Sequence, residues 1–390
     1  MKFVFPSVSF TNGDFGFCSK GSFLSHLTPG GNIAGDPEKS LIHLVYQDRL
    51  GNTELGSCST AQLTDEGKAS LFKLGMNLHE AYIYRAKLLS ATPLPEELHL
   101  RSTEVPRAIE SAQNLLHGMF PAWAYGQIPN RPALDIYIKE EKVEYIFPNF
   151  SRCAKLRREF DKAKEETLKA REKEIDEILA AVKDVVTVTS QKSNSLLYFH
   201  DSLACADAHH MKLPKVLTKE IFLKAEKILT DQWWGTFERS ESLTRLGIGQ
   251  LVRDIADNMK AKTEGSKVKF YLISGHDSTI APLLTAYKVF DGRWPAFACN
   301  IIFELYEAKP PSSKHNAEQQ QQPQQPQQPQ TPATPGISNH FVRMIYNNQI
   351  LNLPGCKATA VEDGTLCPLS DFIDISQKMV PKNYAEECQQ

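Results

Sequence analysis

The sequence predicts an α/β fold whose central sheet is flanked by helices and whose chain is interrupted by an all-helical lobe. Two short strand patterns, near residues 98–100 and 268–274, each lead directly into a helical pattern. The stretch between them, 150–263, shows helical periodicity only. Strands that alternate with helices are typical of an α/β core, so the helical stretch is expected to be an insertion into that core.

The composition is that of an ordinary globular protein and excludes several functional classes. Hydrophobic residues make up 41 % of the 390 residues and charged residues 23 %, with a net charge of −2. This charge gives no electrostatic reason to expect nucleic acid or an anionic membrane surface as a partner. No stretch approaches 18 consecutive apolar residues, and the start at 1–7 is too short for the apolar core of a signal peptide.

Residues 1–149 are expected to form the first part of the α/β core. The first 60 residues are rich in Pro and Gly and predict loops. A helix is expected from Thr64, because apolar residues recur at helical spacing after it. A strand at 98–100 and a second helix at 105–119 follow.

Residues 150–263 are expected to form the helical lobe. The segment 155–183 is dense in Lys and Glu and carries a thin apolar stripe. This pattern is typical of a solvated helix that buries one narrow face. The stripe consists of Leu168, Ile175, Ile178 and Leu179.

Residues 264–390 are expected to complete the core. A strand at 268–274 ends at Gly275, a helix follows at 279–289, and apolar runs at 300–306 and 341–346 can pair as a hairpin. The insertion 310–337 between these runs includes a tract of Gln and Pro and is expected to be disordered. The length of this insertion costs little free energy, because the entropy lost on closing a loop grows only logarithmically with the number of residues in it.

Two strand-to-helix junctions carry candidate functional residues. Arg101 follows one strand, with Ser102 or Thr103 as the expected helix cap, and His276 and Asp277 follow another. Ligands of open α/β sheets bind at the carboxyl ends of strands, where helix N-termini offer N–H groups to anions. The alternatives are a surface salt bridge for Arg101 and a purely structural His-Asp pair.

Other candidate sites have simpler explanations. His209 and His210 lie near Cys205, but adjacent histidines point in different directions, so we expect no metal site. His200-Asp201 lacks a strand-to-helix setting. Asn149 begins a glycosylation sequon, a triplet that often arises by chance. The eight cysteines show no C-x-x-C spacing and allow either four disulfides or buried thiols.

Several motifs resemble those of the histidine acid phosphatases. Residues 100–107 read L-R-S-T-E-V-P-R and are similar to the family's R-S-T-D motif with a following Arg, while 273–279 read I-S-G-H-D-S-T and are similar to S-A-H-D-T-T. Residues 61–67, 353–356 and 366–369 resemble the family's Q-L-T-x-x-G, L-P-G-C and C-P-L motifs. The segment around Cys18 is most similar to the branch of 2-phosphoxylose phosphatase, a Golgi enzyme acting on proteoglycan linkers.

This resemblance implies a central mixed sheet of the phosphoglycerate mutase-like type and a phosphomonoesterase that needs no metal or other cofactor. It implies that Arg101 and His276 bind phosphate and that Asp277 is the general acid. It also implies the disulfides of the family, which leave one further pair of cysteines. The resemblance further implies that the protein is located in the Golgi or lysosomal lumen or outside the cell. The expected pairs are Cys153–Cys388, Cys205–Cys299, Cys356–Cys367 and the remaining Cys18–Cys58.

One departure from the family is decisive for the expected activity. The family nucleophile is the His of R-H-G-x-R-x-P at the end of the first core strand, and this sequence contains no Arg-His pair. We therefore expect the first core strand to be missing, its motif to lie ahead of Met1 in the natural protein, and this chain to be inactive. Any membrane contact would come from an anchor in that missing segment. The alternative is a non-catalytic relative that binds phosphate or a glycan.

Overall fold

The computed structural model describes residues 61–186, 192–308, 339–357 and 365–389. The expectations for residues 1–60, including the Cys18–Cys58 disulfide, lie outside the described residues. The expected disorder of the insertion 310–337 lies outside them as well.

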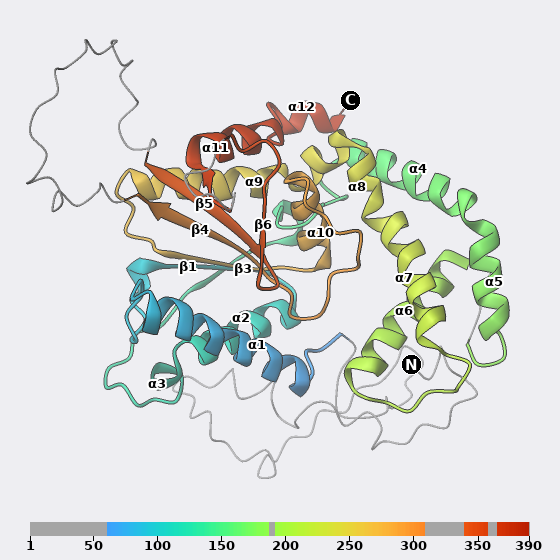
Figure 1. The fold of residues 1–390 in the computed structure, drawn as a ribbon, viewed down its shortest axis with the longest axis horizontal. Coiled ribbons are helices and arrows are strands. Elements are labelled where there is room, and N and C mark those ends of the chain that lie inside the picture. The colour runs from blue at the N-terminus through green and yellow to red at the C-terminus, as the bar shows by residue number, and fades with distance from the viewer. Residues whose placement is uncertain (1–60, 187–191, 309–338, 358–364, 390) are drawn as a thin grey trace, which may run out of the picture.

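The described residues form an α/β core with a helical lobe at one side (Figure 1). The strands are β1 (Leu98–Thr103), β2 (Ile136–Lys139), β3 (Phe270–Ser274), β4 (Ile301–Glu307), β5 (His340–Tyr346), β6 (Gln349–Leu351) and β7 (Cys367–Pro368). The α-helices are α1 (Asp65–Leu78), α2 (Pro106–Met119), α3 (Pro121–Ala124), α4 (Ala154–Ala170), α5 (Glu172–Val182), α6 (Lys192–Ala208), α7 (Lys219–Trp233), α8 (Gly235–Arg239), α9 (Glu241–Thr263), α10 (Asp277–Ala286), α11 (Leu369–Lys378) and α12 (Tyr384–Gln389). A π-helix (His79–Arg85) extends α1, and two 3₁₀ turns are Pro95–Glu97 and Glu141–Val143.

The strands form two sheets with different hydrogen-bonding patterns. In the first sheet the order is β2-β1-β3 and all pairs are parallel, with Leu100 opposite Ile136 on one side and Leu272 on the other. In the second sheet β4 and β5 form the expected antiparallel hairpin, and β6 and β7 both pair with β5. The sequence analysis did not predict β2, whose four residues are too few for a periodic signal.

Strands β3 and β4 lie close together, although no ladder joins them among the described residues. Leu272 of β3 and Ile302 of β4 belong to one hydrophobic cluster, and Ile273 and Phe303 belong to another. All five residues of β3 are only partly buried, whereas β1, paired on both edges, buries five of its six. Among the described residues, the edge of β3 that faces away from β1 and the edge of β4 that faces away from β5 have no strand partner.

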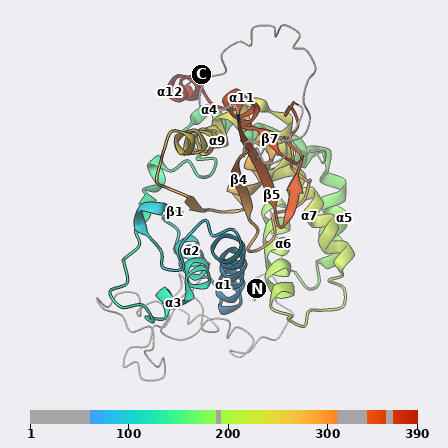
Figure 2. The ribbon, with the colours of Figure 1, turned by 60° about the vertical axis from the view of Figure 1, so that its left-hand side comes forward.

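Helices α1 and α2 cover one face of the parallel sheet, and α9 lies on the other side (Figure 2). Helix α1 begins where it was predicted, and Thr64 caps it, because its Oγ1 accepts a hydrogen bond from Gly67 N at 3.2 Å. The two helices cross in close contact at Gly75 and Gly118. A Cβ at Gly75 would lie 2.0 Å from Leu115 O, so this crossing requires glycine.

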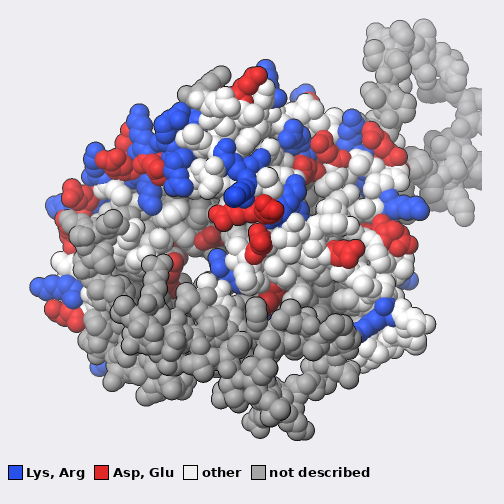
Figure 3. All heavy atoms as spheres, turned by 180° about the vertical axis from the view of Figure 1, so that it is seen from behind, with Lys and Arg blue, Asp and Glu red and all other residues white. Residues whose placement is uncertain are grey.

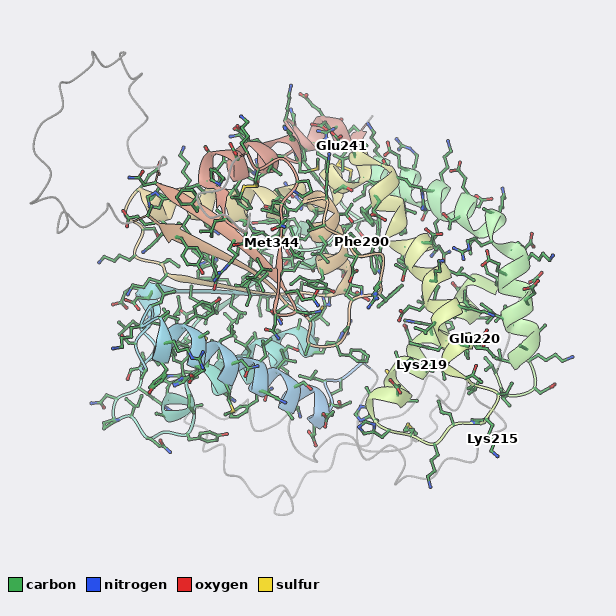
Figure 4. The ribbon with its side chains drawn as sticks, viewed as in Figure 1. Lys215, Lys219, Glu220, Glu241, Phe290 and Met344 are labelled. Atoms are coloured by element: carbon green, nitrogen blue, oxygen red, sulfur yellow. A yellow bond between two sulfur atoms is a disulfide. The ribbon has the colours of Figure 1, made fainter. Side chains whose placement is uncertain are left out.

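Helix α9 packs against α10, α11 and the hairpin strands in the largest hydrophobic cluster. Met344 of β5 is fully buried there, and the partly buried Phe290 packs against the cluster from the loop after α10 (Figure 4). Burial of this apolar surface is what joins the hairpin to the rest of the core.

The predicted helical lobe is present, and its core lies between α5, α6 and α7. Ile175, Ile178 and Leu179 of the predicted stripe are buried in this core, and Leu168 packs against it. Lys215, Lys219 and Glu220 at the end of the lobe are exposed to solvent (Figure 4). Acidic and basic side chains are interspersed over the described part of the face in Figure 3, which fits the small net charge.

Two of the predicted disulfides are formed and one is not. Cys153 is bonded to Cys388, which ties α4 to α12, and Cys356 is bonded to Cys367. Cys205 and Cys299 are free thiols, so the expected bond between them is wrong for this structure. A disulfide needs Cβ atoms about 4 Å apart, and the resemblance could not fix how closely α6 approaches the loop before β4.

The predicted glycosylation site is also wrong. Asn149 is buried, and its Nδ2, the atom that would carry the glycan, donates hydrogen bonds to Glu141 O and Glu144 O at 2.6 and 3.1 Å. A glycan would replace one of the two hydrogens of this nitrogen, so at least one of these bonds would be lost.

Among the described helices, none is both long enough and apolar enough to cross a bilayer.

Candidate active site

The junction between β1 and α2 forms as predicted, but its cap differs from the expected one. Strand β1 continues to Thr103, so Ser102 and Thr103 are strand residues and cannot cap the helix. Val105 occupies the N-cap position without a side-chain hydrogen bond, and Pro106 begins α2. Pro suits this position because the first N–H groups of a helix have no partner within the helix.

Arg101 lies at the carboxyl end of β1, but its guanidinium group forms a buried ion pair. Its Nη2 lies 2.5 Å from Oε1 of Glu144, and the two side chains are 7 % and 1 % exposed. Asp254 lies 3.8 Å from Nη1, and the ring of Tyr145 lies 4.3 Å from the guanidinium carbon. Arg101 Nε has no hydrogen-bond partner among the described residues. Arg101 is therefore held by a carboxylate in the position where the sequence analysis expected a phosphate contact.

In addition to Arg101, Glu144 binds the backbone of the segment that follows it. Its Oε1 accepts hydrogen bonds from the backbone N–H groups of Tyr145 and Ile146 at 2.6 and 2.8 Å. The next residue, Phe147, packs edge-on against the ring of His276, with centroids 5.7 Å apart. The Arg101–Glu144 pair thus supports the wall of the candidate site.

Arg107 is the arginine whose charge acts on the His-Asp pair. It lies in the first turn of α2 and is exposed to solvent. Its positive charge lowers the pKa of both His276 and Asp277. The sequence analysis did not assign this residue a role, although it is the second arginine of the same L-R-S-T-E-V-P-R motif.

His276 is the N-cap residue of α10 and is largely buried. Its Nε2 lies 3.0 Å from Oγ1 of Thr103, which links the two junctions, and its backbone N–H donates to Oγ1 of Thr279 at 3.1 Å. Burial, with the charge of Arg107, lowers the pKa of His276 to about 4. The imidazole is therefore neutral above that pH and has one N–H to donate.

Asp277 is the first residue of α10. Its Oδ1 accepts a hydrogen bond from Ser278 N at 2.7 Å, and its Oδ2 accepts one from Nε1 of Trp294 at 3.1 Å. Burial raises the pKa of Asp277, the charge of Asp201 adds to this, and the hydrogen bonds and Arg107 oppose it. A carboxyl group with a raised pKa is suited to donate a proton at mildly acidic pH.

Together these residues can bind an anion and protonate it. The N-termini of α2 and α10 both begin at the carboxyl end of the parallel sheet, where their N–H groups favour a negative ligand. Arg107 adds a positive charge, His276 a neutral donor and Asp277 an acid. Within the described ranges, no group of three or more His, Cys, Asp or Glu side chains is arranged as a metal-ligand set.

Comparison with known proteins identifies the family. The model of the histidine phosphatase superfamily (branch 2) matches residues 15–347. This chain is a member of branch 2 of the histidine phosphatase superfamily. It is 26 % identical to a probable acid phosphatase of Schizosaccharomyces pombe over 375 residues, covering 86 % of this chain and 78 % of that protein.

Two mammalian relatives support the same family. The chain is 27 % identical to human lysophosphatidic acid phosphatase type 6 over 368 residues, which covers 92 % of this chain and 76 % of the relative. It is 25 % identical to rat prostatic acid phosphatase over 348 residues, which covers 84 % and 80 %. By family the chain is therefore of the acid phosphatase type, a phosphomonoester hydrolase.

Solved structures confirm the fold. The apo form of Hafnia alvei phytase matches with a TM-score of 0.58 at 14 % identity, covering 85 % of this chain and 90 % of that chain. A phytase of Klebsiella sp. ASR1 matches with a TM-score of 0.56 at 16 % identity, covering 83 % and 87 %. The α/β fold with a helical insert, predicted from the sequence, is thus confirmed. The two disulfides are typical of proteins that fold in an oxidising compartment such as the secretory pathway.

Proposed function

We propose that the group formed by Arg107, His276 and Asp277 binds the phosphoryl group of a phosphomonoester, with Asp277 as the general acid. The observation that carries this proposal is that Arg107, in the first turn of α2, and the His-Asp pair at the start of α10 follow the carboxyl ends of the adjacent parallel strands β1 and β3. A guanidinium group and a neutral imidazole N–H can bind phosphate oxygens, while the protonated carboxyl faces the leaving oxygen. Arg107 here replaces Arg101, which the buried ion pair with Glu144 occupies.

The nucleophile of the reaction is proposed to come from a strand between β3 and β4. Within the described part of the chain, one edge of each of these strands has no strand partner, and β3 ends just before His276 and Asp277. A parallel strand paired with β3 would also end beside them, which is where an R-H-G-x-R-x-P motif would be needed. The histidine would attack phosphorus as the P–O bond to the alcohol breaks and Asp277 protonates the alkoxide. Water would then hydrolyse the phosphohistidine, returning its proton to Asp277.

This chain contains no Arg-His pair, so we propose that it does not turn over by itself. The same observation favours the second candidate function. In that alternative the chain is a non-catalytic relative that binds a phosphate or a glycan at the Arg107–His276–Asp277 site.

As the substrate class we propose a phosphorylated sugar or glycosaminoglycan linker, on the resemblance to the 2-phosphoxylose phosphatase-like branch. The relatives offer two other classes. One relative is a lysophosphatidic acid phosphatase, and a phytase of similar fold was solved with myo-inositol hexakis sulphate. A panel of 2-phosphoxylose-containing linker, lysophosphatidic acid and inositol hexakisphosphate separates the three. Preference for either of the last two would contradict the sugar assignment.

The first test is the N-terminal sequence of the endogenous protein, read by mass spectrometry on intact material. An R-H-G-x-R-x-P segment ahead of Met1 supports the phosphatase, and that longer protein should hydrolyse p-nitrophenyl phosphate at acidic pH. An endogenous chain that begins at Met1 contradicts it. In that case, binding of orthophosphate to the chain, measured by calorimetry, would support the non-catalytic alternative.

A further inference from the structure

Trp294 donates a hydrogen bond to the proposed general acid from a different part of the chain. It lies in the loop between α10 and β4, and its Nε1 is 3.1 Å from Oδ2 of Asp277. Since Ser278 N donates to Oδ1 at 2.7 Å, each carboxyl oxygen accepts an N–H group. Two N–H donors stabilise the ionised carboxyl more than the protonated one, and they fix the plane of the group.

The indole of Trp294 is held on two sides by aromatic rings. Its ring centroid lies 5.2 Å from that of His200 and 5.1 Å from that of Trp234. Both partners are buried, at 2 % and 4 % exposure. His200 itself stacks on Phe222 of α7, with ring planes only 5° apart. The indole therefore cannot change its direction without disturbing the helical lobe.

Trp294 also packs against two hydrophobic clusters at once. One is the core of the lobe, between α5, α6 and α7, and the other joins α4, α8 and α9 to Ala281 of α10. Because α10 carries Asp277 at its start, the residue connects the lobe to the element that positions the acid. This connection is absent from the proposed function, in which the lobe has no part in the chemistry.

We propose that Trp294 is a positioning residue through which the helical lobe orients the carboxyl group of Asp277 for proton transfer. The role of Asp277 as the acid rests on the proposed function. The hydrogen bond from Trp294 and the aromatic contacts that hold the indole do not depend on it. In the reaction, the N–H group of Trp294 would stabilise the carboxylate that remains once Asp277 has protonated the leaving oxygen. The same carboxylate would then accept the proton of the attacking water.

Other groups face Asp277 and must stay constant in any test. Arg107 faces it from α2 and Asp201 from α6, and their charges act on it in opposite directions. His276 precedes it on α10, and the thiol of Cys299 is close enough for the charge of Asp277 to raise its pKa. Variants for the test should therefore change an indole N–H group without changing any of these.

The chain offers a matched control for such a variant. Trp234 belongs to the same aromatic cluster as Trp294, but its Nε1 is buried and has no acceptor among the described residues. Trp294→Phe and Trp234→Phe thus remove the same atoms from the same cluster. Only the first removes a hydrogen bond to Asp277.

The experiment is a ¹³C NMR titration of the aspartate carboxyl groups in the chain, with the Asp277 signal assigned by its loss in Asp277→Asn. The midpoint for Asp277 should rise by about one pH unit in Trp294→Phe and stay unchanged in Trp234→Phe, because a hydrogen bond to a carboxylate contributes roughly that much. Equal midpoints in all three proteins would overturn the proposal. Equal shifts in both variants would also overturn it, since packing alone would then explain them.

A second variant guards against a folding defect in Trp294→Phe. Site-specific replacement of the indole at position 294 by benzothiophene keeps the ring and its packing but replaces N–H by sulfur. The same rise in the Asp277 midpoint is expected, and no rise would overturn the proposal. The titration does not depend on turnover, so it separates the two proposals. A longer protein that includes the nucleophile strand could show the rise in the Asp277 midpoint without any phosphatase activity. That result would contradict the proposed function but not the positioning role of Trp294.

Discussion

Strands β1 and β3 are neighbours in one parallel sheet, and each leads into a helix at its carboxyl end. The first junction carries Arg101 and the second carries His276 and Asp277. At the first, a carboxylate from the loop before α4 neutralises the arginine in a buried pair. At the second, the charge of the exposed Arg107 acts on both the histidine and the acid, and the charge of Asp201 acts on the acid. The same local design thus supports the structure at one junction and offers a ligand site at the other.

The buried pair at the β1–α2 junction should be needed for stability. Replacing Arg101 by Met leaves the charge of Glu144 buried without its partner, which typically costs about 3–5 kcal/mol of the free energy of unfolding. Urea unfolding of Arg101→Met against the parent chain measures this. The double variant Arg101→Met/Glu144→Gln should recover most of the loss, because Gln keeps an acceptor for the N–H groups of Tyr145 and Ile146. A decrease in the free energy of unfolding below about 1 kcal/mol, as for a surface ion pair, would contradict the structural role of the Arg101–Glu144 pair.

The histidine at the β3–α10 junction should make stability depend on pH. Its pKa falls to about 4 in the folded protein from 6.5, so between these values the unfolded chain binds the proton and the folded chain does not. Stability should therefore decrease as the pH falls from 6.5 to 4, by at most about 3 kcal/mol.

The measurement is the difference in urea unfolding between the parent chain and His276→Asn across this pH range. The difference should change with pH only inside the window, since Asn does not titrate. Asp277 contributes in the opposite direction, because its raised pKa favours the folded state at low pH, and it is present in both proteins. A difference that is constant with pH would show that His276 titrates normally.

Substitutions of the two arginines should have different effects on the affinity for a phosphate-like ligand. Arg107→Ala should weaken the binding of orthovanadate, a phosphate analogue, by about 10- to 100-fold, because a hydrogen bond between charged groups is lost. Its stability should stay unchanged, since the side chain is exposed. Calorimetric titration of Arg107→Ala and Arg101→Met under conditions where both are folded gives the comparison. A larger affinity loss in Arg101→Met would return the phosphate contact to Arg101.

The smallest effect is expected from the hydrogen bond that joins the two junctions. Thr103→Val keeps the shape of the side chain and removes the Oγ1 that lies 3.0 Å from Nε2 of His276. The loss should be about 1 kcal/mol of stability, because one neutral hydrogen bond disappears at a buried position. Unfolding of Thr103→Val, with Thr103→Ser as the control that keeps the hydroxyl group, measures it. Equal losses in both variants would assign the effect to the methyl group.

Local patterns in the sequence were sufficient for most of the fold. The start of α1 at Thr64, the strands that became β1 and β3, and the β4–β5 hairpin all follow from short-range signals that the structure confirms. The absence of an Arg-His pair likewise indicated a missing strand, which stays a prediction because residues 1–60 lie outside the described part of the chain. Such features depend on residues a few positions apart, which a single sequence displays directly.

Long-range contacts explain where the sequence analysis was wrong or incomplete. Arg101 appeared free because Glu144 lies 43 residues away, and Asn149 appeared exposed because its backbone partners come from a turn that only the fold closes. The free thiols of Cys205 and Cys299 depend on how the lobe sits on the core. None of these distances is encoded in spacing along the chain.

The sequence by itself therefore determined the class of fold, several of its main helices and strands, the family and the position of the His-Asp pair. The tertiary structure decided which arginine faces that pair and that Trp294 of a distant loop donates to Asp277. The physical reason is that helices and strands follow from local periodicity, whereas the burial and the partner of a charge depend on elements far apart in the chain.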